Sequence, residues 1–317
     1  MSQKKFDVLV VGELNVDLIL NRIDGFPEMG KEIIADQMTL TLGSSSAIFA
    51  SNLSALGAKV AFLGKIGQDS FAELVIESLQ AKGVYTGFII RDNKLATGAT
   101  IVLNYGDDRA MVTHPGAMNH LTIKDITPEI VQQARHLHFS SYFLQPGLKN
   151  DVGTMFRLAK EHGLTTSFDM QWDPAEEWDL DYRNVLPQVD VFLPNKQEII
   201  QLTKQINYRE ALNQLSSPNI VVVKMSSDGS YCRFEGQEYV VPAFKNEHIV
   251  DAIGAGDSFN AGFIFKYIQG KPLEECMRFG NLTGAINTTA AGGTTAFSNY
   301  DQIMKLGRER FGYEEAK

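Results

Sequence analysis

Residues 251–263, DAIGAGDSFNAGF, place two glycines and a carboxylate directly before a helical pattern. The first amides of a helix lack partners within the helix and carry the positive end of its dipole. Glycines just upstream allow further amides to point the same way, with no side chain between them and a ligand. Gly254, Ala255 and Gly256 therefore predict an anion-binding turn, with Asp257 at the start of the helix. The alternative is a purely structural helix cap that follows a tight glycine turn.

Two similar glycine patterns do not indicate other kinds of nucleotide site. The GAGDSF segment is similar to part of a dinucleotide-binding motif, but Phe259 occupies the third glycine position and the motif lies late in the chain. The segment GFPEMGK has the spacing of a phosphate-binding loop, but Glu32 replaces the required Ser or Thr and Pro27 interrupts the loop. A nicotinamide-dependent oxidoreductase and a P-loop enzyme are therefore disfavoured.

The rest of the pattern predicts the elements that position this turn. In the second half, buried strands alternate with helical stretches, which predicts a mainly parallel sheet covered by helices on both faces. Segments 14–42 and 96–117 instead alternate apolar and polar residues, as antiparallel strands with one wet face do. We expect a single α/β domain over 1–317 in which these segments form a small β lid, with a hairpin turn at 106–108.

Composition limits the class of partner. The 317 residues have a net charge of −9, which disfavours binding to nucleic acid or anionic lipid. No apolar run approaches the roughly 18 residues of a membrane helix, and the amino terminus lacks the apolar stretch of a signal peptide. Cys232 and Cys276 lie far apart, which favours a reduced, cytoplasmic protein over a disulfide framework. We therefore expect a small-molecule partner, and neither nucleic acid nor a membrane.

Five segments resemble the ribokinase/PfkB family of carbohydrate kinases, in the family's order and along nearly the whole chain. DAIGAGDSFNAGF is similar to the family's second signature, commonly D-T-x-G-A-G-D-x-F, and LPNKQE to its N-x-x-E element. VGELNVDLIL resembles the opening strand, TGATIVLNYGDDRAMVTHPGAMNHLT the lid hairpin, and FGNLTGAINTTAAGGT the adenine-side helix and loop. The resemblance implies a ribokinase-like α/β fold, with a mainly parallel central sheet, helices on both faces and a small antiparallel β lid.

The resemblance also implies an ATP-dependent sugar kinase that uses Mg²⁺. Asp257 would accept the proton of the attacking hydroxyl, and the amides of residues 254–257 would stabilise the transferred phosphate. An unperturbed aspartate pKa of about 3.9 predicts an ionised, weak base at neutral pH. Asn195 and Glu198 would hold water ligands of Mg²⁺ or orient phosphates. A helix capping box is the alternative for the same pair.

The nucleotide side has weaker signals. Lys224, Ser226 and Gly229 stand where the family often has a strand followed by T-L-G-x-x-G, and the resemblance implies ribose or phosphate contacts; an ordinary β-turn is the alternative. Asn281 would lie near the adenine, or is simply a polar residue of a helix. A potassium site is implied by five residues that match the family's monovalent-cation loop: Asp251, Ile253, Asn287, Ala290 and Gly292.

At the sugar end, Asp17 suits a polyol because a carboxylate accepts hydrogen bonds from two adjacent hydroxyls; an exposed turn aspartate is the alternative. Gly43 and Ser44 align with the start of the family's G-G-x-x-x-N segment, but Ser44 replaces the second glycine and Ile48 replaces a sugar-binding asparagine. These departures predict sugar recognition that differs from that of ribokinase. Arg109 would contact a sugar phosphate or carboxylate, or is a solvated hairpin charge.

Four other polar residues have open interpretations. Asn52 would replace the missing sugar-binding asparagine, unless the turn of its helix aims it elsewhere. His136 and His138 share one face of a strand and are interpreted as core histidines rather than metal ligands. Asp169 belongs to a segment similar to the family's D-x-x-W and would reach the site.

The combined interpretation is a kinase for a ribose-, fructose- or sugar-acid-like carbohydrate. The alternatives are a nucleoside or phosphosugar kinase, and a non-catalytic sugar sensor of the same fold. The apolar face and open edges of the lid predict a homodimer formed through the lid.

Overall fold

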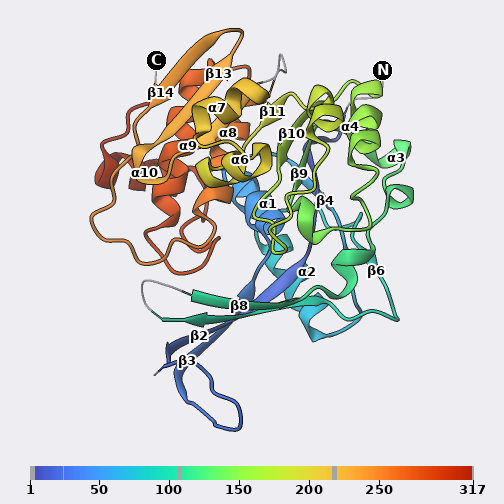
Figure 1. Ribbon diagram of the computed structural model, residues 1–317, viewed down its shortest axis with the longest axis vertical. Helices are drawn as coiled ribbons and strands as arrows, with labels where there is room; N and C mark the ends of the chain where they lie inside the picture. Colours follow the sequence, from blue (N-terminus) through green and yellow to red (C-terminus); the bar gives the residue numbers. More distant parts are fainter. Residues whose placement is uncertain (1–3, 24, 106–108, 216–219, 316–317) are drawn as a thin grey trace.

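An eight-stranded sheet crosses the molecule in a computed structural model that describes residues 4–23, 25–105, 109–215 and 220–315 (Figure 1). The strand order is β14-β13-β12-β11-β10-β9-β1-β4. The strands from β4 to β12 are parallel, and β13 and β14 extend the sheet antiparallel. The bounds are β1 Phe6–Val11, β4 Val60–Leu63, β9 Ala134–Ser140, β10 Thr165–Asp169, β11 Val191–Phe192, β12 Ile220–Lys224, β13 Ser230–Phe234 and β14 Gln237–Val241.

Helices cover both faces of this sheet because its parallel strands are apolar on both sides. Leu9 and Val11 of β1 belong to one hydrophobic core, whereas the alternate residues Val8 and Val10 belong to the other. Helices α3, α4, α5, α6 and α7 pack into the first core, and α1, α2, α8 and α9 into the second. The bounds are α1 Ser45–Ala55, α2 Ser70–Ala81, α3 Pro128–Val131, α4 Val152–Glu161, α5 Tyr182–Val185, α6 Lys196–Thr203, α7 Tyr208–Gln214, α8 Ala255–Tyr267, α9 Leu273–Asn287 and α10 Tyr300–Phe311.

A small four-stranded sheet projects from one end of the main body, at the bottom of Figure 1. Its order is β3-β2-β7-β8, with β2 Asn15–Ile23, β3 Ala35–Leu42, β7 Gly98–Asn104 and β8 Arg109–His114. The outer pairs are antiparallel, whereas β2 and β7 pair in parallel. The expected hairpin turn at 106–108 lies outside the described residues. A further two-stranded sheet joins β5 Lys65–Ile66 to β6 Ile90–Arg91.

The register of the small sheet separates a polar face from an apolar face. Residues that stand opposite one another across four strands share a face. One row is polar and carries the expected sugar ligand: Thr41, Asp17, Thr100 and Thr113. The next row, on the opposite face, is apolar: Leu40, Leu18, Ile101 and Val112.

The predicted fold class is confirmed, with its large, mainly parallel sheet and its small second sheet. The carboxyl ends of β1, β9, β10 and β12 lie along one edge of the large sheet, where ligands of open α/β folds bind. Within the described ranges, no helix is both long and apolar enough to cross a bilayer.

Candidate active site

The glycine turn before α8 has the predicted form. Gly254 is the N-cap residue, with a left-handed φ of 75°. A Cβ at Gly254 would also lie 2.9 Å from Gly293 Cα and 3.0 Å from Ile48 Cγ2. Both the backbone conformation and the packing therefore exclude a larger residue at this position. At Gly256 a Cβ would meet only Lys224, with 3.7 Å to its Nζ, which is ordinary contact. Packing therefore does not require Gly256, and among the contacts of the described residues its amide donates no backbone hydrogen bond outside the helix, which leaves it open to a ligand.

Asp257 follows in the first turn of α8, with 6% of its surface exposed. Gln171 Nε2 donates a hydrogen bond of 2.9 Å to Asp257 Oδ1. Burial raises the pKa of Asp257 to about 8; the charges of Asp169 and Glu13 act in the same direction, and Lys224 and the Gln171 hydrogen bond oppose them. The expectation of a weak base ionised at neutral pH was therefore wrong, because sequence alone does not report this burial.

Lys224, at the end of β12, makes a different contact from the predicted ribose or phosphate contact. Its Nζ lies 2.5 Å from Asp169 Oδ2, at the carboxyl end of β10. Although burial opposes a charged ammonium, the carboxylates of Asp169 and Glu198 raise the pKa of Lys224. Because Nζ also lies beside Gly256, the structure places a positive charge next to the open amide of the glycine turn.

The turn after β12 is closed by a hydrogen bond of 3.2 Å from the Gly229 amide to the Ser226 carbonyl, as in the β-turn given as the alternative. Ser226 has a left-handed φ of 54°, and Gly229 has a φ of 97°. A Cβ at Gly229 would overlap the carbonyl oxygen of Val241 at the end of β14. Asn281 Nδ2 donates to that same carbonyl at 3.0 Å and to the Pro242 carbonyl at 3.2 Å. Gly229 and Asn281, two of the residues predicted for the nucleotide side, therefore lie against the same backbone segment at the end of β14.

Asn195 and Glu198 form a complete capping box at the start of α6. Asn195 Oδ1 accepts from the Glu198 amide at 2.9 Å, and Glu198 Oε2 accepts from the Asn195 amide at 2.7 Å. Burial raises the pKa of Glu198 to about 7, with Asp169 adding to the effect and Lys224 opposing it. The capping box that was the alternative interpretation of this pair is therefore present. It holds the Glu198 carboxyl group near the Lys224 ammonium.

The expected cation loop is brought together in space. Asp251 accepts hydrogen bonds from the amides of Ile253 and Gly292, both at 2.9 Å. Asn287 Nδ2 donates to the Ile253 carbonyl at 2.6 Å, and the Ala290 amide donates to the Asn287 carbonyl. Residues from two distant segments therefore form one loop cluster beside the glycine turn.

Asp17 lies on the polar face of the small sheet. Asn15 Nδ2 donates to Asp17 Oδ1 at 3.1 Å, and a Cβ at Gly43 would overlap the Asp17 carboxyl. Burial raises the pKa of Asp17 to about 6; the Asn15 hydrogen bond and Arg109 lower it, and Glu13 raises it. The absence of a side chain at Gly43 therefore leaves room for the Asp17 carboxyl group. Arg109 is exposed on β8, and its charge reaches that carboxyl group.

Glu13, which sequence reasoning missed, lies between the sugar end and the catalytic end. It is 2% exposed, and its charge acts on both Asp17 and Asp257. Glu13 Oε1 accepts from Ser44 Oγ at 3.0 Å and from the Ser46 amide at 3.2 Å, and its other oxygen accepts from Ser46 Oγ. Its place directly after the first strand was the available signal.

The departures at positions 44, 48 and 52 have structural reasons. Ser44 has a φ of 68°, which favours glycine, yet its hydroxyl caps α1 by accepting from the Ala47 amide at 2.9 Å. Ile48 is buried against Gly254 and Gly293. Asn52 Nδ2 donates to Ser258 Oγ and to the Gly293 carbonyl, both at 2.9 Å. Ile48 and Asn52 thus support the glycine turn, and Asn52 does not replace a sugar ligand.

His136 and His138 are core residues, as predicted. Both rings contact Ser167 Oγ at 2.7 Å, and His138 stacks on Phe49 with 3.7 Å between ring centroids. Burial lowers the pKa of both imidazoles, that of His136 to about 3. In the part of the chain that the structure describes, no group of three His, Cys, Asp or Glu side chains is arranged to bind a metal.

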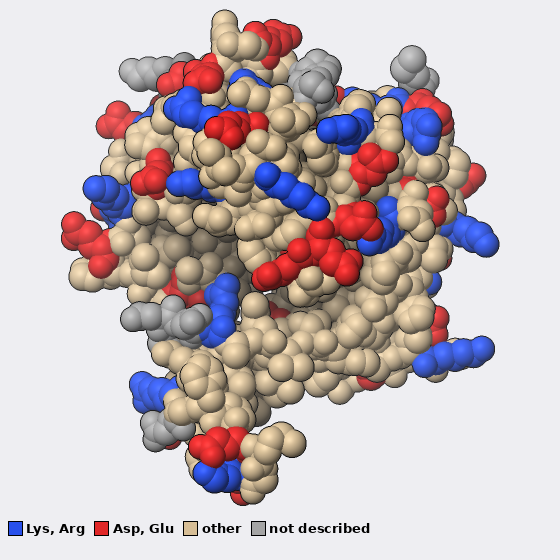
Figure 2. All heavy atoms as spheres, viewed as in Figure 1, with Lys and Arg blue, Asp and Glu red and all other residues tan. Residues whose placement is uncertain are grey.

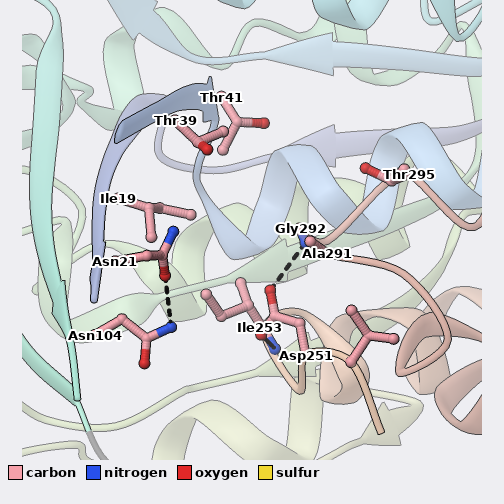
Figure 3. Close-up of a pocket in the computed structure, with 11 residues that line it drawn as sticks. Ile19, Asn21, Thr39, Thr41, Asn104, Asp251, Ile253, Ala291, Gly292 and Thr295 are labelled. Atoms are coloured by element: carbon pink, nitrogen blue, oxygen red, sulfur yellow. Dashed lines mark hydrogen bonds between the residues drawn. The ribbon is translucent and has the colours of Figure 1, made fainter. Parts of the chain in front are cut away.

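A cavity of about 170 Å³ separates the small sheet from the cation loop (Figure 3). On one side, Ile19 and Asn21 continue the face of β2 that carries Asp17, and Asn104 Nδ2 donates to Asn21 Oδ1 at 2.9 Å. Figure 2 shows the surface hollowed above the small sheet. The full lining is Ile19, Asn21, Thr39, Thr41, Asn104, Val250, Asp251, Ile253, Ala291, Gly292 and Thr295.

Known proteins are similar to this chain in sequence and in fold. The sequence profile of the pfkB family carbohydrate kinases matches residues 5–299. A protein of Archaeoglobus fulgidus described as an uncharacterized sugar kinase is 32% identical over 235 residues, covering 74% of this chain and 92% of that protein. An ATP-dependent ribose-1-phosphate kinase of Halopiger xanaduensis is 28% identical, covering 96% and 99%. The crystal structure of adenosine kinase from Sinorhizobium meliloti, 26% identical, superposes with a TM-score of 0.83 and covers 96% and 99%.

The family match spans the small sheet, the glycine turn and the capping box at the start of α6. The motifs that carry the resemblance therefore lie in one folded unit of the right topology. This chain belongs to the pfkB family of carbohydrate kinases.

Proposed function

We propose that this chain transfers the γ-phosphate of ATP to a hydroxyl group of a small carbohydrate, with Asp257 as the base. The observation that supports this most directly is the first turn of α8, where the open amide of Gly256 and the carboxyl group of Asp257 are neighbours. Amides at a helix N-terminus suit a phosphate, and an adjacent carboxylate suits the proton of an attacking alcohol.

In the proposed reaction, the acceptor oxygen bonds to the γ-phosphorus while the bond from phosphorus to the bridging oxygen of ADP breaks. The acceptor proton passes to Asp257, whose raised pKa makes it a stronger base than an ordinary aspartate. The Ala255 amide already donates to the Ala252 carbonyl at 3.2 Å. The amides of Gly256 and Asp257 are therefore the donors we assign to the developing phosphate charge.

The phosphates and Mg²⁺ would lie between the glycine turn and α6. Asn195 and Glu198 offer oxygen atoms, which Mg²⁺ prefers, and Glu198 is held beside Lys224. Bound Mg²⁺ neutralises phosphate charge in such transfers. Lys224 would add a positive charge beside Gly256.

The remaining nucleotide and cation contacts are proposed from the same geometry. Gly229 and Asn281 lie against the end of β14, a backbone segment against which the ribose and adenine would lie. Ser226, in the same turn as Gly229, would contact the ribose or a phosphate. A potassium ion would be held by carbonyl groups of the loop cluster that Asp251 organises; its proposed ligands are Asp251, Ile253, Asn287, Ala290 and Gly292.

The acceptor we infer is a neutral polyol. Asp17 is a hydrogen-bond acceptor for hydroxyl groups, and its charge together with that of the buried Glu13 disfavours a second anion nearby. Arg109, whose charge reaches Asp17, is the feature that favours a phosphosugar instead. A relative that is named for ribose-1-phosphate makes this the second candidate.

The small sheet is proposed to act as a lid and as a dimer interface. Its polar face carries Asp17 toward the acceptor, and closure there would exclude water from the transfer. Its opposite face exposes a row of apolar side chains, including Leu40 at 40% and Val112 at 67% exposed. We infer that a second copy of the chain covers this row.

The test is ADP release with Mg²⁺ and a panel of sugars, sugar acids, nucleosides and hexose monophosphates. We expect sugar-dependent turnover, and a loss of at least about 100-fold in kcat for Asp257→Asn with ATP binding retained. Sugar-induced thermal stabilisation without turnover would indicate a sensor instead. Arg109→Glu should raise KM sharply only for a phosphosugar acceptor, and near-normal turnover by Asp257→Asn would refute the role of Asp257.

A further inference from the structure

A buried carboxylate lies behind the proposed base and is linked to it. Asp169 ends β10 and has no exposed surface, so it cannot touch a substrate. Its Oδ2 accepts from Lys224 Nζ at 2.5 Å, Asn260 Nδ2 at 2.5 Å and Gln171 Nε2 at 3.1 Å. Its Oδ1 accepts from the Gln171 amide at 3.2 Å. A buried carboxylate with this many donors is fixed in position.

Gln171 connects this buried carboxylate to the base. Its Nε2 group donates both to Asp169 Oδ2 and to Asp257 Oδ1, the latter at 2.9 Å. Gln171 adopts a left-handed φ of 62°, which is unfavourable for a residue other than glycine. Such strain persists only where surrounding contacts enforce it, and it often marks a functional position.

The other two donors fix the parts of the active site next to Asp257. Asn260 lies three residues after Asp257 on α8, so its bond to Asp169 holds the first turns of that helix against β10. Lys224 is held by the same carboxylate with its Nζ beside Gly256. One buried side chain thus contacts the base through Gln171, the catalytic helix through Asn260, and the phosphate side through Lys224.

We propose that Asp169 and Gln171 are positioning residues of the kinase reaction, which aim the Asp257 carboxylate at the acceptor hydroxyl and hold the Lys224 ammonium beside the phosphate. This inference rests on the proposed function of Asp257. It adds that α8 alone does not orient the Asp257 carboxyl group. Its orientation also depends on the hydrogen bond from Gln171, which Asp169 at the end of β10 holds in place.

The same contacts also set the basicity of Asp257. Four groups from different elements face its carboxyl group: Asp169 from β10, Lys224 from β12, Glu13 after β1 and Gln171 after β10. The charge of Asp169 favours the protonated form of Asp257, whereas the donated hydrogen bond of Gln171 favours the ionised form. Removing the two residues should therefore move the titration of Asp257 in opposite directions.

The experiment compares Asp169→Asn and Gln171→Met with the full unmodified chain, using the acceptor that the panel identifies. The acidic limb of the kcat/KM profile should move to lower pH by about one unit in Asp169→Asn and to higher pH in Gln171→Met. We expect kcat to fall by about 10-fold to 100-fold in Gln171→Met, because a misaimed base slows transfer, with KM for ATP within about twofold.

Asp173→Asn is the matched control. Asp173 is buried in the same loop and accepts from the Ala175 and Trp178 amides at 2.9 and 2.7 Å, but no bond joins it to Asp257 in the described contacts. It should lower thermal stability without moving the acidic limb. Loop damage alone predicts that all three variants shift the limb equally or not at all, and that result would overturn the proposal.

Two failures remain distinguishable. If the unmodified chain releases no sugar-dependent ADP, the proposed function itself fails. If it does and both variants keep its kcat and its acidic limb, only the positioning role fails. Should Asp169→Asn not fold, Gln171→Met decides alone, because Gln171 is only partly buried.

Discussion

Replacing the proposed base should stabilise the folded protein while abolishing turnover. In the folded chain the pKa of Asp257 is raised from 3.8 to about 8. A carboxyl group whose pKa is raised by folding holds its proton more tightly in the folded state. It therefore costs no stability below about pH 4, and costs progressively more as the pH rises through the interval from 3.8 to about 8. Asp257→Asn carries no titrating proton and removes this cost.

The size of this stability cost follows from the difference between the unfolded and folded pKa values of Asp257. Each pH unit between the two pKa values is worth about 1.4 kcal/mol, so at pH 7 the cost is about 4 kcal/mol. A chain of 317 residues has an unfolding entropy near 0.7 kcal/mol per kelvin, which converts this to a rise in Tm of about 6 °C. The asparagine keeps an oxygen that can accept the Gln171 hydrogen bond, so little packing is lost.

The assay is thermal unfolding followed by circular dichroism at pH 5, 6, 7 and 8, with ADP release measured on the same samples. Asp257→Asn should unfold at a higher temperature than the unmodified chain, by a margin that grows with pH. Glu161→Gln, an exposed position at the end of α4, is the control and should show no such growth. A Tm difference that is zero or independent of pH would show that folding does not raise the pKa of Asp257, whatever the turnover.

Three further predictions test other parts of the structure. Ser44→Ala should lower the free energy of unfolding in urea by about 1–2 kcal/mol, because it loses the α1 cap and keeps the left-handed φ; an unchanged midpoint would contradict this. Glu198→Gln should raise the Mg²⁺ concentration for half-maximal rate by about 10-fold with KM for sugar unchanged, as a metal titration would show; an unchanged titration would remove Glu198 from the metal site. Leu40→Lys combined with Val112→Lys should convert a dimer to a monomer in sedimentation velocity, and a monomeric unmodified chain would end the dimer proposal.

The part of the site that was predicted from sequence is local in the chain. Gly254, Gly256 and Asp257 are neighbours, and their geometry follows from glycine φ freedom and the start of a helix. Asn195 and Glu198 are three residues apart, and either interpretation places them at a helix start. In each case the spacing in sequence already fixes the spacing in space.

The part that could not be predicted is assembled by the topology. Gln171 and Asp257 are separated by 86 positions, and Asn260 and Asp169 by 91. Single polar residues at such separations carry no periodic signal, and a left-handed glutamine has no sequence mark. The family resemblance predicted a ribose or phosphate contact for Lys224, but only the order β12-β11-β10 shows that Asp169 also lies within its reach.

Strand direction in the small sheet illustrates the same limit. Alternation of polar and apolar residues predicted strands with one wet face, and the rows through Asp17 and Leu18 confirm that alternation. Alternation is identical in parallel and antiparallel pairs, so it did not reveal that β2 and β7 run in parallel.

The arrangement of buried charges explains why the active site lowers the free energy of unfolding and why the fold is stable despite this cost. Three buried carboxyl groups, those of Asp169, Glu198 and Asp257, gather at the carboxyl edge of the sheet around the ammonium of Lys224, and a fourth, that of Glu13, acts on Asp257. The raised pKa values of Glu13, Glu198 and Asp257 are each a stability cost, whereas the two apolar cores on the faces of the sheet contain none of these groups. The cost is also what makes the site reactive, because a carboxyl group that resists ionisation in its buried state is a stronger base once it is ionised. A single substitution, Asp257→Asn, should therefore both raise the free energy of unfolding and remove the phosphate transfer.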